Sequence, residues 1–248
     1  MKLSGKTAFI TGCNRGVGKA VCENFLNNGA NIICAVRKKN SEFSKYIRFL
    51  KKKFKTTIQV LEFDLSDEKK MLKSLKLIYN KNLIIDILVN NAAIATGSLF
   101  EMTSMPDLKR VFEINYFAQM NIIQKLLRHM KKSKNASIIN VGSIAGFLNH
   151  RGTIAYGSSK AALMFSTKVM ANEFSLYKIR VNAIAPSAVN TDMFNQMTQK
   201  GKIELLKKSY LKKPLTKKKI VDKILYLASD QSLKVNGQVI KIYGRTSN

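Results

Sequence analysis

The sequence predicts a single α/β domain built on a doubly wound, mostly parallel sheet with helices on both faces. The chain has 248 residues, a length compatible with one such domain, and its 46% hydrophobic content is sufficient to fill a core. Short apolar segments alternate with helical patterns along the chain, as in βαβ units. A glycine-rich segment follows the first apolar segment, where such sheets bind ligands.

Seven short apolar segments are expected to form the strands. They cover residues 7–10, 32–36, 57–63, 84–89, 136–141, 179–184 and 238–242. Helical patterns are expected after the glycine-rich segment, at 42–54, after Asp67, and at 107–132, 155–177 and 217–229, with an irregular helical stretch at 190–213. Together these elements predict a single-domain Rossmann fold over residues 1–248, with a seven-stranded sheet and right-handed crossovers.

The composition argues against a membrane-spanning protein and against a disulfide-stapled secreted domain. No segment approaches the roughly 18 consecutive apolar residues of a membrane helix, and the N-terminus lacks the pattern of a signal peptide. The three cysteines, Cys13, Cys22 and Cys34, form no CxxC pair and accompany only two histidines, so we predict no metal site. Cys13 lies near a predicted helix N-terminus and near Arg15, which favours a lowered thiol pKa, although a plain loop residue is the simpler reading. We expect a cytoplasmic protein.

The chain is strongly basic. Lysine and arginine number 43 against 15 acidic residues, which gives a net charge of +28. Such a surplus points to an anionic partner, which could be nucleic acid, an acidic membrane face or an acidic protein. The lysines are spread over most helical segments, however, and this favours a lysine-rich solvated surface over a dedicated binding patch.

The glycine-rich segment predicts a dinucleotide site. Gly12, Gly16 and Gly18 separate a strand from a helix, so the backbone can approach a pyrophosphate at the helix N-terminus. A tight turn without a ligand is the alternative.

At the end of the second strand, where an acid would hold the ribose of NAD, the sequence has Arg37 followed by two lysines. A guanidinium binds a 2′-phosphate well, so we predict NADP(H), unless 37–39 is only solvated surface.

Four polar residues predict proton-transfer chemistry. Tyr156 and Lys160 are four residues apart and share one helix face. A nearby ammonium lowers the pKa of a phenol, so Tyr156 can act as general acid. Ser143 follows the fifth strand and can stabilise a developing oxyanion. Asn115 lies within a predicted helix, where asparagine is unfavourable. Each also has a simpler explanation. Tyr156 and Lys160 could be a solvated pair on a helix, Ser143 a loop or helix-cap residue, and Asn115 an exposed polar side chain.

Taken together, the motifs resemble the short-chain dehydrogenase/reductase family. TGCNRGVG at 11–18, NNAA at 90–93, Asn115, Ser143 and YxxxK at 156–160 occur in the family's order across nearly the whole chain. The resemblance implies NADPH-dependent reduction of a carbonyl to an alcohol, with the cofactor bound mainly by residues 1–140 and the substrate by 141–248. It assigns Asn115, Ser143, Tyr156 and Lys160 to catalysis, with Asn115 distorting its helix and holding a water. The implied cofactor contacts are Gly12, Asn14, Arg15, Gly16, Val17, Gly18, Arg37, Asp64, Leu65, Asn91, Ala92, Tyr156, Lys160, Pro186, Val189 and Thr191.

Some positions depart from the family or have a second reading. Ala93 and Ser187 stand where the family usually has glycine, and alanine is costly wherever a positive φ is needed. Asp64 could instead belong to the start of a helix together with Asp67. The resemblance also implies that Asn90 steadies the sheet.

The substrate is less constrained than the reaction. Members of the family that reduce 3-oxoacyl groups on acyl carrier protein, in fatty acid biosynthesis, have a similar length, ANEF…IRVNAIAP stretch and GQVI ending. Because that carrier is acidic, Arg128, Lys131 and Lys132 are candidate docking cations. A sugar or other small keto substrate is the alternative, and an NADP-binding protein that holds nucleic acid is an alternative of another class.

The resemblance also implies a lid and an assembly. Residues 190–213 are expected to cover the substrate. Their apolar side chains are Met193, Phe194, Met197, Leu205, Leu206 and Tyr210. A homotetramer is implied, with the helices near 107–132 and 155–177 pairing between subunits.

Overall fold

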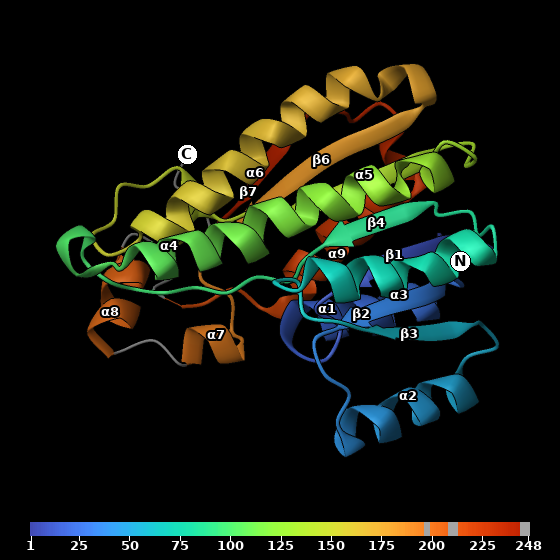
Figure 1. Cartoon of the computed structure of the whole chain (residues 1–248), viewed down its shortest axis with the longest axis horizontal. Coiled ribbons are helices and arrows are strands. Elements are labelled where there is room, and N and C mark those ends of the chain that lie inside the picture. The colour runs from blue at the N-terminus through green and yellow to red at the C-terminus, as the bar shows by residue number, and fades with distance from the viewer. Residues whose placement is uncertain (196–198, 208–212, 244–248) are drawn as a thin grey trace.

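The computed structural model describes residues 1–195, 199–207 and 213–243, and one seven-stranded sheet runs through it (Figure 1). The strands are β1 (Thr7–Thr11), β2 (Asn31–Val36), β3 (Ile58–Glu62), β4 (Ile87–Asn90), β5 (Ala136–Val141), β6 (Ile179–Pro186) and β7 (Val239–Ile242). Their order is β3-β2-β1-β4-β5-β6-β7, and every neighbouring pair is parallel. The predicted doubly wound fold is therefore confirmed.

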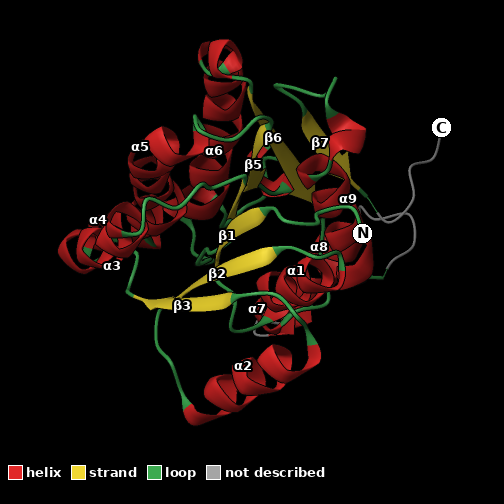
Figure 2. Cartoon of the chain, turned by 90° about the vertical axis from the view of Figure 1, so that its right-hand side faces the viewer, coloured by secondary structure: helices red, strands yellow, loops and turns green. Residues whose placement is uncertain are grey.

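Helices cover both faces of the sheet, as Figure 2 shows. One face packs against α1 (Gly16–Asn27), α2 (Ser41–Lys53) and α9 (Lys217–Ala228), and the other against α3 (Glu68–Asn80), α5 (Ala118–Met130) and α6 (Ile154–Glu173). Side chains alternate between the two cores along each strand, so that Ile10 joins the first core and Phe9 the second. Because both faces are buried, the strands read in the sequence as continuous apolar segments.

Several predicted elements differ in extent from the observed ones, and two of them are instructive. The helix expected at 107–132 is divided into α4 (Met105–Phe112), a π-helical turn (Glu113–Phe117) and α5. The fourth strand begins only at Ile87, directly after Asp86, whose carboxylate is engaged beside the sheet. It accepts hydrogen bonds from the Thr7 backbone N–H at 2.8 Å and from the Ser133 hydroxyl at 2.6 Å.

The carboxyl ends of the strands meet at the left-hand edge of Figure 1. Strand order reverses between β1 and β4, which makes this edge the expected ligand crevice. Two short helices, α7 (Asp192–Asn195) and α8 (Gln199–Lys207), lie at the same edge within the predicted lid. In the described part of the chain, no helix is long and apolar enough to cross a membrane.

Candidate active site

The catalytic candidates meet where β5 ends and α6 begins. Ser143 starts a 3-10 turn (Ile144–Gly146), and its hydroxyl accepts a hydrogen bond from the Ala145 backbone N–H at 3.1 Å. The first turn of α6 packs directly on this turn, because a Cβ at Gly157 would lie 2.8 Å from the Ala145 carbonyl oxygen. The contact places the Tyr156 phenol beside the hydroxyl of Ser143, which acts to lower the pKa of the phenol.

Lys160 lies one helical turn beyond Tyr156 and is almost fully buried, with 2% of its surface exposed. Its Nζ donates to the Val141 carbonyl oxygen at 2.7 Å and lies 6.0 Å from the centroid of the Tyr156 ring. Burial lowers the pKa of this ammonium to about 8, since the charged form is poorly solvated here. The side chain can therefore change its charge close to physiological pH.

The phenol of Tyr156 has a raised pKa. Burial raises it, and the neighbouring Ser143 side chain only partly offsets that effect. We predicted from the spacing of Tyr156 and Lys160 that the ammonium would lower this pKa, and that prediction is wrong for this structure. The ammonium is directed to the Val141 carbonyl, and desolvation of the phenol dominates. The phenol is consequently protonated at neutral pH, which is the form that can donate a proton.

Asn115 lies within the π-helical turn and is fully buried, which rules out the reading as an exposed amide. Its Oδ1 accepts the Ile94 N–H at 2.9 Å, while its Nδ2 donates to the Ile94 carbonyl at 2.9 Å and to Ser159 Oγ at 3.1 Å. Ser159 in turn donates to the Tyr156 carbonyl oxygen at 2.8 Å. Asn115 is thereby joined to the backbone of the tyrosine, and the helix distortion implied by the family resemblance is present.

Three glycines leave the backbone of the loop after β1 open to a ligand. Gly12 and Gly16 have φ angles of +74° and +59°, which favour glycine. A Cβ at Gly18 would lie 2.2 Å from the Gly12 carbonyl oxygen, so no larger residue fits there. The N-cap residue of α1, Arg15, makes no side-chain cap, and the first turn carries no acid. A glycine-rich loop before a helix N-terminus that has no side-chain cap fits the pyrophosphate of a dinucleotide.

Basic and acidic candidates flank this loop on the β2 and β3 side. Arg37 follows β2 directly and is exposed, as are the two lysines after it. Asp64 Oδ1 accepts hydrogen bonds from the N–H and the hydroxyl of Ser66, at 2.9 and 2.8 Å. The N-cap of α3 is Asp67, whose carboxylate accepts the Lys70 N–H at 3.0 Å, so Asp64 does not cap the helix. Leu65 is buried in the core beneath α3.

Segment 187–192 faces the glycine loop. A Cβ at Gly16 would lie 3.8 Å from Thr191 Cγ2, and Arg15 Nη1 lies 3.9 Å from Asp192 Oδ2. Thr191 Oγ1 donates to the Val189 carbonyl at 3.2 Å. Ser187 and Ala93 both lie outside the positive-φ region, so neither position needs the glycine that the family usually has there. The concern about strain at Ala93 is thus removed.

A family model of short chain dehydrogenases matches residues 6–202. The chain belongs to the short-chain dehydrogenase family. Full-length relatives agree with this assignment. The 3-oxoacyl-[acyl-carrier-protein] reductase FabG of Thermotoga maritima is 32% identical over 246 residues, and that of Aquifex aeolicus is 30% identical over 245 residues. Each alignment covers 98% of this chain and 98% of the relative.

Solved structures of short-chain dehydrogenases superpose closely on this one. The Pseudomonas aeruginosa RhlG/NADP active-site complex has a TM-score of 0.88 and 26% identity, covering 98% of this chain and 96% of its own. A 4-hydroxyisoleucine dehydrogenase complexed with NADH has a TM-score of 0.85 and 27% identity, covering 97% of this chain and 98% of its own. Relatives with this fold thus include one solved with each dinucleotide.

Some residues that build this site of a short-chain dehydrogenase were not predicted from the sequence. Thr11, at the end of β1, accepts the backbone N–H groups of Asn91 and Ala92 on one hydroxyl oxygen, both at 2.9 Å. Asn140 on β5 accepts from the Asn90 amide at 2.9 Å and donates to Thr167 Oγ1 on α6 at 2.9 Å. The sequence signal that could have identified Thr11 and Asn140 was a polar residue at or near the end of an otherwise apolar strand.

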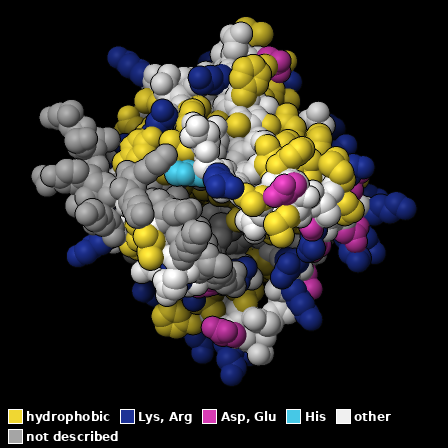
Figure 3. Space-filling view, turned by 90° about the vertical axis from the view of Figure 1, so that its left-hand side faces the viewer, with side chains coloured by type: hydrophobic (Ala, Val, Ile, Leu, Met, Phe, Trp, Pro, Cys, Tyr) yellow, Lys and Arg dark blue, Asp and Glu magenta, His cyan; other side chains and the backbone are white. Residues whose placement is uncertain are grey.

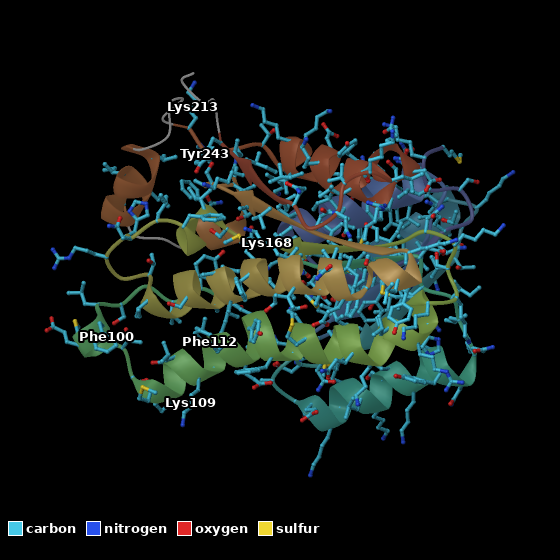
Figure 4. The ribbon with its side chains drawn as sticks, turned by 90° about the horizontal axis from the view of Figure 1, so that it is seen from above. Phe100, Lys109, Phe112, Lys168, Lys213 and Tyr243 are labelled. Carbon is cyan, nitrogen blue, oxygen red and sulfur yellow. The ribbon has the colours of Figure 1, made fainter. Side chains whose placement is uncertain are left out.

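Figure 3 views the carboxyl edge from the left of Figure 1, and hydrophobic side chains lie there among projecting lysines and arginines. Phe147 is 47% exposed and Ile154 is 41% exposed, and both lie between Ser143 and Tyr156 in the sequence. In Figure 4 this edge is again at the left, with Phe100 labelled near it. Of the expected lid residues, Phe194 and Leu206 are half-buried, whereas Met197, Tyr210 and the side chains of Met193 and Leu205 lie outside the described part.

The structure does not bring the candidate docking cations to this site. Arg128, Lys131 and Lys132 lie at the end of α5, beside the start of β5 and thus at the opposite edge of the sheet. Lys131 Nζ lies 3.4 Å from the ring centroid of Tyr177, which follows the end of α6. Tyr156 is near the start of that 20-residue helix, which is about 30 Å long. Within one chain these cations cannot guide a substrate to Tyr156.

The prediction of a low thiol pKa at Cys13 is wrong. The side chain is completely buried beneath the glycine loop, and this burial raises its pKa well above the usual value. A thiol needs contact with solvent or a charged partner to become reactive. Arg15 does not supply that contact, because its side chain is 62% exposed and is paired with Asp192.

The buried ammonium predicts a pH-dependent stability. The folded state holds the proton of Lys160 less tightly than the unfolded chain does, so the free energy of unfolding rises with pH above about 8. Between pH 8 and pH 9.5 we expect the native protein to gain about 1.5 kcal/mol relative to Lys160→Met. Chemical denaturation across this pH range measures the difference. Lys168→Met, at an exposed lysine of the same helix, should follow the native curve. If the free energy of unfolding changes with pH in the same way in the native protein and in Lys160→Met, the lowered pKa of Lys160 is contradicted.

Proposed function

We propose that this chain is an NADPH-dependent carbonyl reductase whose substrates are 3-oxoacyl groups carried by acyl carrier protein. The observation that carries the proposal is the close contact of the first turn of α6 with the turn after β5, which places the protonated Tyr156 phenol beside Ser143 at the carboxyl edge of the sheet. Buried Lys160 lies behind this pair, and the glycine cradle lies at the same edge. A proton donor, an oxyanion donor and a dinucleotide cradle together are what carbonyl reduction requires.

Each residue is assigned one task. A bound nicotinamide supplies the hydride that the carbonyl carbon accepts. Ser143 and Tyr156 bind the carbonyl oxygen, and Tyr156 donates its phenolic proton as negative charge develops there. The charge of Lys160 favours the phenolate that remains, and its ammonium is also suited to the hydroxyls of the nicotinamide ribose. Asn115 holds the Ile94 backbone and Ser159, and so fixes the position of the tyrosine.

The glycine cradle and its flanks would hold the cofactor. Gly12, Gly16 and Gly18, with Asn14, Arg15 and Val17 between or beside them, are suited to the pyrophosphate. Further contacts are assigned to Asp64, Leu65, Asn91, Ala92, Pro186, Val189 and Thr191. Arg37 favours NADP over NAD, because an exposed guanidinium at the end of β2 can bind a 2′-phosphate at two oxygens.

The substrate class rests on the relatives and on the surface around Tyr156. The FabG relatives, 30–32% identical, are named as 3-oxoacyl-[acyl-carrier-protein] reductases. Exposed Phe147 and Ile154 offer apolar surface to an acyl chain, and the basic rim suits an acidic carrier. A small keto substrate is the competing outcome, and an assay with acetoacetyl thioesters, keto-sugars and small keto acids separates the two. The nucleic-acid alternative stays an untested prediction.

Removal of the phenolic hydroxyl tests the proposed chemistry. Tyr156→Phe is expected to lower NADPH oxidation with an acetoacetyl thioester by at least about 100-fold, since the general acid is lost. Binding of NADPH, followed by its fluorescence, should change by less than about twofold because the packing is retained. Tyr177→Phe, outside the site, serves as the matched control with native turnover. Full turnover by Tyr156→Phe would refute the role of this residue.

Charge reversal at Arg37 tests the cofactor preference. Arg37→Asp is expected to weaken NADPH binding by at least about tenfold while NADH binding changes little, because a carboxylate repels the 2′-phosphate. Lys55→Asp is the control, since this exposed lysine precedes β3 at the opposite edge of the sheet. If Arg37→Asp and Lys55→Asp lose NADPH affinity equally, only the overall charge of the protein matters for binding. An unchanged NADPH-to-NADH ratio in Arg37→Asp would contradict the assignment.

We further propose that the protein is a cytoplasmic homotetramer that assembles through α4, α5 and α6. The outer surface of these helices and of the π-helical turn carries large exposed apolar side chains, including Phe117 at 54%, Phe165 at 70% and Val169 at 43% exposure. Tyr116 and Ser166 join the two elements through hydroxyls 3.1 Å apart. Clustered apolar groups on a monomer surface mark an interface. The three unpaired cysteines suit a reducing compartment.

A charge placed in this surface is expected to disrupt the assembly. Phe165→Asp should shift the mass measured by light scattering from four chains to one or two, because an unpaired carboxylate would be buried between subunits. Phe49→Asp, at a 58% exposed phenylalanine on α2, should leave the mass unchanged. A native protein that is already monomeric, or a tetrameric Phe165→Asp, would contradict the proposal.

A further inference from the structure

Three cysteines from different segments converge beneath the glycine loop. Cys13 lies in the loop after β1, Cys22 on α1 and Cys34 on β2. Their sulfur atoms all lie within 4.8 Å of one another, and those of Cys22 and Cys34 are 3.8 Å apart. The side chains are 0–1% exposed. These are all the cysteines of the chain, and a single βαβ unit gathers them at one point.

The cluster has no task in the proposed reaction. None of its sulfurs is disulfide-bonded, and Cys13 donates its S–H to the Ile10 carbonyl at 2.9 Å. The surrounding side chains belong to the apolar core between the sheet, α1 and α9.

The geometry suits a trigonal thiolate centre. A metal bound to three sulfurs at about 2.3 Å in one plane separates those sulfurs by about 4 Å. The observed cluster already has this size. Within the described residues, no histidine or carboxylate joins the group as a fourth ligand. Zinc prefers four ligands in structural sites, whereas thiolates without other donors select soft ions such as Cu(I).

We propose that Cys13, Cys22 and Cys34 form a binding site for one Cu(I) ion beneath the glycine loop. Each cysteine that ligates as a thiolate releases its proton to solvent, so the apparent affinity rises with pH. The sulfurs are buried, so the ion requires an opening of the loop, where the neighbouring Asn14 and Arg15 are exposed. No electron is transferred, since copper enters and stays as Cu(I).

Occupancy of this site is coupled to the loop above it. Ligation draws the sulfur of Cys13 away from the Ile10 carbonyl, and Cys13 is adjacent to Gly12. The loop has little slack, because a Cβ at Gly12 would lie only 2.8 Å from Asn91 Nδ2. Bound Cu(I) is therefore expected to weaken NADPH binding by at least about fivefold, and NADPH to weaken Cu(I) binding by the same factor. This coupling, unlike the metal site, rests on the proposed function.

Anaerobic titration with Cu(I) against a chromogenic copper chelator tests the site on the full-length protein without dinucleotide. We expect one ion per chain, with a thiolate-to-copper band in the ultraviolet and three sulfur neighbours at about 2.3 Å by X-ray absorption. Cys34→Ala and Cys22→Ala should each weaken binding by at least about tenfold. Val21→Ala is the matched control, because it removes buried methyl groups beside Cys22 and keeps all three thiols.

The outcomes are distinct. Equal Cu(I) affinity in the native protein and in both cysteine variants would overturn the proposal, as would a two-sulfur shell or tighter binding of Zn(II) than of Cu(I). NADPH titration of metal-free and Cu(I)-loaded protein tests the coupling, and equal affinities would overturn it. If metal-free protein binds no NADPH, the coupling and the proposed function fail together. The Cu(I) titration decides the metal site in either case.

Discussion

The site depends on one close backbone contact, between the first turn of α6 and the turn that follows β5. Gly157 and Gly146 make the contact possible, since a Cβ at either position would lie 2.8 Å or less from atoms across the interface. The same contact sets the distance from Ser143 to Tyr156 and places Lys160 under the end of β5. Once these backbones touch, water is displaced from the phenol and the ammonium, and both acquire pKa values that they would not have in solvent.

A buried polar network holds the strands that carry this contact. Thr11 connects the ends of β1 and β4, while Asn90, Asn140 and Thr167 connect β4, β5 and α6. Each donor in this set has a partner, so the network fixes strand ends that apolar packing alone would leave free to slide. The glycine loop and Tyr156, the proposed proton donor, are thereby held at one edge of the sheet.

The sequence was sufficient for the topology and for the order of the motifs, because strand and helix periodicities and the glycine loop are local signals. It could not give the direction of the pKa of Tyr156, since a four-residue spacing shows proximity but not desolvation. It could not give the distance of Arg128, Lys131 and Lys132 from Tyr156, because their position follows from the direction in which α5 runs. The cysteine cluster was invisible for a similar reason: residues 13, 22 and 34 meet only after the βαβ unit has formed.

The π-helical turn at Glu113–Phe117 has a consequence for how this chain can vary. Such a turn arises from one residue more than a regular helix would hold, and each residue rotates a helix by about 100°. Loss of that residue would straighten the helix, swing Asn115 out of the interior and turn the surface of α4 away from that of α5. The position of Asn115 and the surface that we propose as a subunit contact therefore depend on the same helix register, so a change in helix length here would disturb both.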